Sequence, residues 1–162
     1  MVKAISRKEQ IKKEAKKLFK AKGYTATSMR DLAGNVGIEA ASLYNHFKSK
    51  EAILQTICFD LANQLTELIV KIDVQKSAAQ QLEKAIQGHV LVSSKNMEAS
   101  VIFFNDWKHL SEPYLGDFKA LRIAYENHFM NIIQAGVNTK QFSDIDVIVF
   151  TKTILSSINS IV

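Results

Sequence analysis

Apolar residues near the start of the chain recur at the spacing of an amphipathic helix. The pattern predicts a helix over residues 7–22 whose inner face is formed by Ile11, Ala15, Leu18 and Phe19. Ser6 and Glu9 stand at the positions of a capping box before this helix. Gly23 follows it and suits a left-handed helix end. The first 23 residues therefore predict one capped helix.

Two shorter apolar patterns follow. Ser28 precedes Asp31 by three residues, a second capping-box spacing, and predicts a helix with Met29, Leu32 and Ala33 on its inner face. The run 34–37, Gly-Asn-Val-Gly, interrupts that pattern before a third predicted helix over 39–47. Two short helices joined by a turn with glycine near its centre are what a helix-turn-helix requires.

The rest of the chain also shows helical periodicity. Ser49 predicts the cap of a long fourth helix, with an apolar stripe from Ile53 to Ile72, that connects two domains. Further helices are expected over 78–93, 97–109 and 115–137, and a last one begins at Asp144, after Ser143 as its cap. The prediction is an all-α fold of eight or nine helices. A three-helix helix-turn-helix domain (1–50) is joined by the long helix to a larger helical ligand-binding and dimerisation domain (51–162).

The charge distribution supports this division. The 162 residues carry a net charge of +5, but residues 1–54 hold 12 lysines and arginines against five acidic residues, and the remainder hold nine against 11. A basic N-terminal part favours a polyanion such as DNA as its partner. On charge alone, a lysine-rich helix face that only interacts with solvent remains the alternative.

Composition excludes several other classes. The single cysteine leaves no internal disulfide and favours a reduced, cytoplasmic setting. The charged N-terminus lacks the apolar stretch of a signal peptide, and no apolar run approaches the ~20 residues of a membrane span. Metal-ligand spacings, glycine-rich phosphate loops and nucleophile elbows are absent from the sequence, and the four histidines are scattered. We therefore expect neither an enzyme nor a cofactor.

One segment carries a specific family pattern. The run Leu43-Tyr44-x-His46-Phe47-x-Ser49-Lys50-Glu51, within a continuous match from Ile11 to Leu54, resembles the DNA-binding domain of the tetracycline-repressor (TetR/AcrR) family of bacterial one-component regulators. The resemblance implies an all-helical homodimer in which a ligand in the C-terminal domain changes the spacing of two DNA-reading heads. Gly34 departs from the pattern, because the family more often has a larger residue there.

The third helix is expected to enter the major groove. Its small first residues allow the backbone to approach the base edges closely: Ala40, Ala41 and Ser42. Arg30 is predicted to read guanine O6 and N7, with Ser42 and Asn45 as shorter readers. A surface ion pair is the alternative for Arg30.

Other side chains of this region have donors suited to phosphate. They are Ser28, Tyr44 and His46, although His46 could equally serve in packing. The resemblance implies that Tyr44 and Lys50 clamp the DNA backbone, Lys50 from a helix N-terminus that already favours anions. Of the basic residues at the start of the chain, only Lys3, Arg7 and Lys8 are expected to reach phosphate.

The C-terminal half predicts an effector site. Residues 103–113 together with Leu121-Arg122 and Tyr125-Glu126 are similar to a TetR subgroup whose members respond to acyl-CoA or related lipid-degradation metabolites. The residues expected to line a large apolar pocket are Met97, Phe103, Phe104, Trp107, Tyr125 and Phe129. Arg122 could hold a phosphate or carboxylate. Ordinary core packing is the alternative for the aromatic residues, and a pair with Glu126 is the alternative for Arg122.

The last two helices are expected to form the homodimer. Thr151, Ser156, Ser157 and Ser160 are small enough to permit close helix approach around Ile154, Leu155 and Ile158. Because the chain stops within an apolar helix, we expect a truncated C-terminus. The predicted function is a cytoplasmic repressor that binds a palindromic double-stranded DNA operator and is released by a small apolar or acyl-CoA-type effector. The alternative is a helical DNA-binding or interaction protein with a packed core and no effector.

Overall fold

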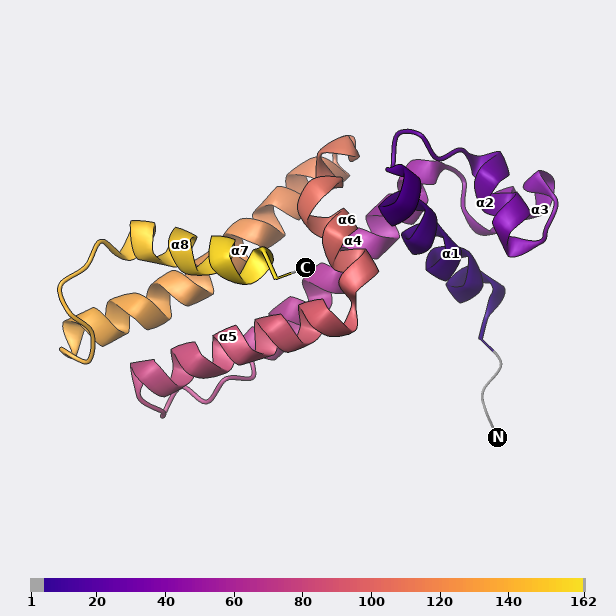
Figure 1. The fold of residues 1–162 in the computed structure, drawn as a ribbon. Coiled ribbons are helices and arrows are strands. Elements are labelled where there is room, and N and C mark those ends of the chain that lie inside the picture. The colour runs from indigo at the N-terminus through magenta and orange to yellow at the C-terminus, as the bar shows by residue number, and fades with distance from the viewer. Residues whose placement is uncertain (1–4, 162) are drawn as a thin grey trace. The chain divides into compact units, whose positions relative to one another are not determined.

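The computed structural model describes residues 5–161, and the elements within this range are all helical (Figure 1). This confirms the all-α prediction. The α-helices and one 3₁₀ turn are α1 (Arg7–Lys22), α2 (Met29–Val36), α3 (Ala40–His46), α4 (Lys50–Ile69), α5 (Ala78–Lys95), α6 (Met97–Asn105), η1 (Trp107–His109), α7 (Tyr114–Asn138) and α8 (Val147–Asn159). None of these helices is long and apolar enough to cross a membrane.

The predicted caps at the start of the first two helices hold, whereas Gly23 ends α1 with φ 84° and ψ 152°, outside the left-handed helical region that was predicted for it. The Ser6 side chain accepts a hydrogen bond from the Glu9 amide at the start of α1. Helix α2 ends at Gly37, whose φ of 73° lies in the left-handed region that glycine adopts without strain. The predicted interruption at Gly34 is wrong, because α2 continues through Gly34 to Val36. A Cβ at Gly34 would meet open space, so packing does not require glycine there.

Several later boundaries differ from the prediction. The stretch 97–109 is not one helix, because α6 ends at Asn105 and a separate 3₁₀ turn follows. Helix α4 ends at Ile69, before the predicted end of its stripe at Ile72. Helix α8 begins at Val147, not at Asp144, and Asp146 replaces Ser143 as its cap by accepting a hydrogen bond from the Val149 amide.

The chain forms two compact units. The N-terminal unit contains the described residues up to Asp60 together with Glu98–Leu115. The C-terminal unit contains Leu61–Met97 and the described residues from Gly116 onward. Compactness therefore divides the chain differently from the predicted boundary at residue 50, because 51–60 and 98–115 belong with the N-terminal helices.

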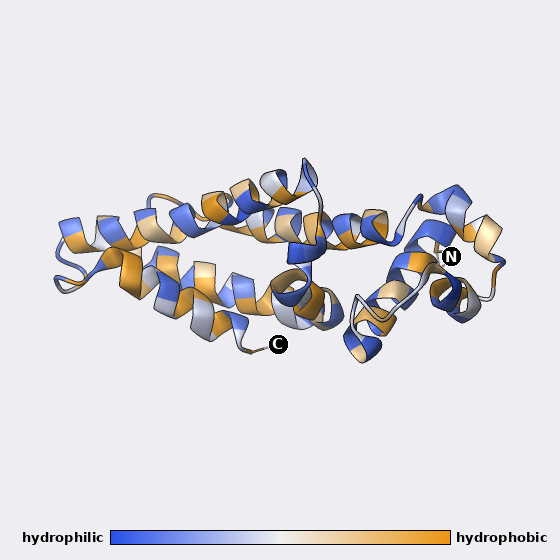
Figure 2. Cartoon of the chain, turned by 90° about the horizontal axis from the view of Figure 1, so that it is seen from above, coloured by the Kyte–Doolittle hydropathy of each residue, from blue (hydrophilic) through white to orange (hydrophobic). Residues whose placement is uncertain are grey.

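Apolar stripes of α1, α2 and α3 build the core of the helix-turn-helix. Most helices carry orange apolar and blue polar stripes in Figure 2, as amphipathic helices do. The core residues of these three helices and the residue that follows them are Ile11, Ala15, Leu18, Phe19, Leu32, Ala33, Leu43 and Phe47, all buried. Each large apolar side chain buried in this way contributes about 1.5–3 kcal/mol. The core thus fixes the orientation of α2 and α3.

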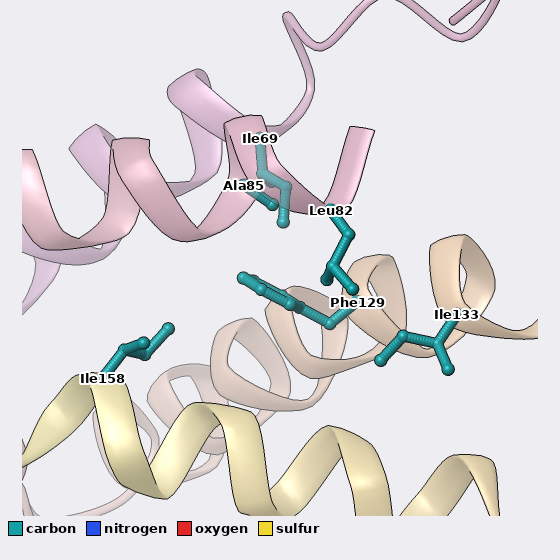
Figure 3. Close-up of a cluster of buried hydrophobic side chains, with 6 residues drawn as sticks. All are labelled: Ile69, Leu82, Ala85, Phe129, Ile133 and Ile158. Carbon is teal, nitrogen blue, oxygen red and sulfur yellow. The ribbon is translucent and has the colours of Figure 1, made fainter. Parts of the chain in front are cut away.

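A separate cluster forms the core of the C-terminal unit (Figure 3). Its buried members come from α4, α5, α7 and α8: Ile69, Leu82, Ala85, Phe129, Ile133 and Ile158. Thr151 is also fully buried, and its hydroxyl donates to the Val147 carbonyl. Thr151 and Ile158 therefore pack within their own unit, not at the dimer surface for which the sequence proposed them.

Candidate nucleic-acid interface

Helices α2 and α3 bury one face and expose the other. Leu32 and Leu43 are completely buried and hold the two helices in the N-terminal core. Most of the residues predicted to contact DNA lie on the exposed side: Ser28, Arg30, Ala41, Tyr44, Asn45 and His46. Ala40, Ser42 and Lys50 are half-buried. Ala41, Tyr44 and Asn45 are three and four residues apart on α3 and so share one face. That face can offer an amide, a phenol and a small side chain to a base edge.

The start of α2 is fixed by a reciprocal cap. The Ser28 hydroxyl accepts from the Asp31 amide at 3.1 Å and donates to Asp31 Oδ2 at 2.6 Å, and the Ser28 amide donates to the same oxygen at 2.8 Å. These hydrogen bonds lower the pKa of Asp31. The hydroxyl proton of Ser28 is thus already donated, and its predicted phosphate contact would require an exchange of this bond.

Lys50 has contacts that the sequence did not predict. Its Nζ donates to the carbonyl oxygens of Tyr24, at 2.8 Å, and Thr25, at 3.2 Å. The same ammonium lies 4.3 Å from the centroid of the Tyr24 ring. Lys50 therefore binds the turn between α1 and α2. An ammonium has three donors, so one remains for a phosphate oxygen.

Two basic residues of α1 already contact other side chains of the N-terminal unit. Burial disfavours a charge on Lys12, but hydrogen bonds to Asp60 and Glu9 outweigh it and raise the pKa of this side chain. Lys8 lies over the Phe47 ring, 5.2 Å from its centroid, next to the end of α3. The predicted contact residue Lys3 lies outside the described residues.

The predicted effector residues fall in both units. Phe103, Phe104 and Trp107 belong to the N-terminal unit, whereas Met97, Arg122, Tyr125 and Phe129 belong to the C-terminal unit. Phe129 is completely buried in the core cluster, as the packing alternative expects. Met97 is an exposed side chain.

A buried polar pair lies beside that core cluster. His89 Nδ1 and the Tyr125 hydroxyl are 3.0 Å apart, and His89 is almost fully buried. Burial lowers the pKa of His89 to about 4, with the Asn159 side chain acting in the opposite direction, so the ring is neutral near pH 7. Burial also raises the pKa of the Tyr125 hydroxyl. The pair is thus an uncharged hydrogen-bonding group within an apolar unit.

One cavity of about 590 Å³ opens between the end of α4 and the outer face of α5. Its lining includes Leu68, Ile72, Gly88 and Leu91 and none of the seven predicted effector residues. Among the described residues, no three His, Cys, Asp or Glu side chains come together as a metal site. The residues predicted for an effector therefore do not line this cavity.

Comparison with known proteins gives matches to both parts of the chain. Residues 11–57 match the family described as bacterial regulatory proteins, tetR family, and residues 75–162 match the tetracyclin repressor-like C-terminal domain. The HTH-type transcriptional repressor KstR2 of Mycolicibacterium smegmatis is 32% identical over 148 residues, which cover 88% of this chain and 71% of that repressor.

Solved structures share the fold over almost the whole chain. The crystal structure of the TetR family regulator PfmR from Thermus thermophilus superposes with a TM-score of 0.88 at 32% identity, covering 97% of this chain and 84% of the other. AibR in complex with isovaleryl coenzyme A and operator DNA superposes with a TM-score of 0.85 at 19% identity, covering 96% and 85%. At that identity the second likeness concerns the fold.

Proposed function

The chain belongs to the tetR family of bacterial regulatory proteins, and from this premise we propose that it is a cytoplasmic repressor that binds a palindromic operator as a homodimer. The observation that carries the proposal is the exposed face of α2 and α3, which the buried Leu32 and Leu43 fix in place. An α-helix of this kind fits the major groove of B-DNA.

We assign base reading to Arg30, Asn45 and Ser42, and backbone contacts to Ser28, Tyr44, His46 and Lys50. Arg30 is exposed at the start of α2, where its guanidinium is available to guanine O6 and N7. Ala40 and Ala41 allow close approach of the α3 backbone to the DNA. Phosphate contacts set the register and the salt dependence, whereas base contacts set the sequence.

The proposed homodimer uses α7 and α8. Ile123 on α7, and Ile148 and Val149 on α8, each expose more than half of their surface. Large apolar side chains on exposed helix faces favour a protein partner, and a second copy would give the two-fold symmetry that a palindromic operator matches. Two reading helices would then enter successive major grooves about 34 Å apart.

The proposed effector is a small apolar molecule or an acyl-CoA. Support comes from AibR, which shares the fold and whose solved complex contains isovaleryl coenzyme A and operator DNA. The effector must bind the DNA-competent and DNA-incompetent states with different affinities, because otherwise the equilibrium does not move. The residues predicted to contact it within the C-terminal unit are Met97, Arg122, Tyr125 and Phe129.

The test begins with selection of duplexes by the full chain from a randomised DNA pool. We expect enrichment of one palindromic sequence, bound by two copies of the chain. Titration of that complex with a long-chain acyl-CoA should then release the DNA and raise the melting temperature of the free protein. Failure to enrich any sequence contradicts the repressor, whereas DNA binding that no acyl-CoA alters favours the alternative without an effector.

A further inference from the structure

A short segment outside the helix-turn-helix contacts the turn that leads into it. The Tyr24 ring, in the turn between α1 and α2, stacks on the His109 ring of η1, with centroids 5.0 Å apart and planes at 25°. The Phe19 ring meets the Tyr24 ring edge-on at 5.1 Å. Tyr24 is a buried side chain, although it lies in a turn. Both contacts lie within the N-terminal unit.

The same segment also contacts the start of α4. Glu51, in the first turn of α4, accepts a hydrogen bond from the Ser111 amide at 2.6 Å. The neighbouring Leu110 is buried. Lys50 completes the arrangement through its bonds to the carbonyls of Tyr24 and Thr25. We name the set Tyr24, Lys50, Glu51, His109 and Ser111 the turn clasp.

The turn transmits this restraint to α2. Thr27 is buried, its hydroxyl donates to the Gly23 carbonyl at 2.9 Å, and its amide donates to the Tyr24 carbonyl at 3.3 Å. Ser28, the cap of α2, comes next in the chain. A residue that holds Tyr24 therefore also restrains the cap Ser28, which lies two residues before Arg30.

We propose that His109 and Glu51 are positioning residues for DNA reading: they hold the α1–α2 turn and the start of α4 in the arrangement that presents α2 and α3 to the operator. The proposal rests on the proposed DNA-binding function and adds residues that contact no DNA.

The decisive variant is His109→Ala, compared with His109→Phe, which keeps a ring to stack, and with Lys108→Ala as the control. Lys108 is the exposed neighbour in the same 3₁₀ turn. The probe is the duplex that the unaltered chain selects. An aromatic pair of this kind supports an effect of about three- to tenfold on affinity. We expect His109→Ala to bind this duplex about three- to tenfold more weakly than the unaltered chain. His109→Phe should bind it as the unaltered chain does. Lys108→Ala should lose only the affinity that the removal of one positive charge far from the DNA costs.

Amide hydrogen exchange of the full chain without DNA provides the independent readout. We expect His109→Ala to raise exchange at residues 24–31 and to leave the amides of α5 unchanged, and Glu51→Ala to do the same while Glu51→Gln, which keeps an acceptor, does not. Unchanged exchange at 24–31, or equal DNA binding by His109→Ala and the unaltered chain, would overturn the clasp. Failure of the unaltered chain to select DNA would contradict the proposed function instead, and the exchange result would still decide the clasp.

Discussion

Replacement of Lys50 by methionine tests whether this side chain stabilises the α1–α2 turn in addition to its predicted contact with phosphate. Methionine keeps an unbranched stem beside the Tyr24 ring but removes the ammonium that donates to the carbonyls of Tyr24 and Thr25. We expect the variant to unfold more easily, because both carbonyls lose a charged donor.

The magnitude follows from these contacts. A hydrogen bond to a charged group contributes about 1.5–3 kcal/mol, and a cation over an aromatic ring contributes about 0.5–1 kcal/mol at an exposed site. Lys50 is half-buried and Thr25 is exposed, so water replaces part of what is lost. We expect a net loss of about 2 kcal/mol, which lowers the melting temperature of a chain of this size by about 4–8 °C.

The assay is thermal unfolding followed by circular dichroism, with Lys48→Met as the matched control. Lys48 is exposed and lies two residues earlier, so its variant changes the same charge and should shift stability by no more than about 0.5 kcal/mol. DNA affinity at several salt concentrations gives the second readout. If Lys50→Met leaves the melting temperature unchanged but lowers the slope of log DNA affinity against log salt concentration by about one, Lys50 does not stabilise the α1–α2 turn. It would then act only as a phosphate contact.

Three further predictions concern other parts of the chain. Arg30→Ala should lower operator affinity by about 1–3 kcal/mol and relax base preference at one position of each half-site; duplex selection checks this, and unchanged selectivity would exclude Arg30 as a reader. Gly136→Ala should cost about 1–3 kcal/mol in urea unfolding, because the new Cβ overlaps the Phe142 ring. Gly34→Ala, with open space around it, should add about 0.5–1 kcal/mol, so the same sign for both glycine variants would contradict the packing described. His89 has a pKa of about 4 in the folded protein, below its ordinary value of 6.5, so the folded state favours the neutral ring. The free energy of unfolding should therefore fall by up to about 3 kcal/mol as the pH drops from 6.5 to about 4. The stability difference between the unaltered chain and His89→Gln should therefore shrink from pH 7 to pH 4, and a constant difference would disprove this origin.

Local signals in the sequence predict the helix-turn-helix well. The Ser6 position and the Ser28 and Asp31 spacing predict the caps of α1 and α2. These features depend on residues a few positions apart, which is why the pattern is sufficient. The resemblance to the TetR family is confirmed, and since the family and its relatives are transcriptional regulators, so is the prediction that the chain is not an enzyme.

Features that depend on distant residues could not be predicted in this way. The bonds from Lys50 to the turn carbonyls and the stacking of His109 on Tyr24 join positions that no periodicity connects. Helical spacing also does not show whether Thr151 and Ile158 pack against their own chain or against a second copy. In the structure both are buried within the C-terminal unit. The predicted DNA-contact and effector residues remain predictions for the same reason: their roles depend on a partner.

Methylation interference on the selected duplex tests the central claim most directly. Methylation of guanine N7 blocks contacts in the major groove, whereas methylation of adenine N3 blocks contacts in the minor groove. We predict two groups of interfering guanines, about one helical turn apart and related by the two-fold axis of the operator, with one group lost in each half-site for Arg30→Ala. Interference confined to adenine N3, or spread along the duplex without a two-fold pattern, would contradict a dimer that reads DNA through α2 and α3.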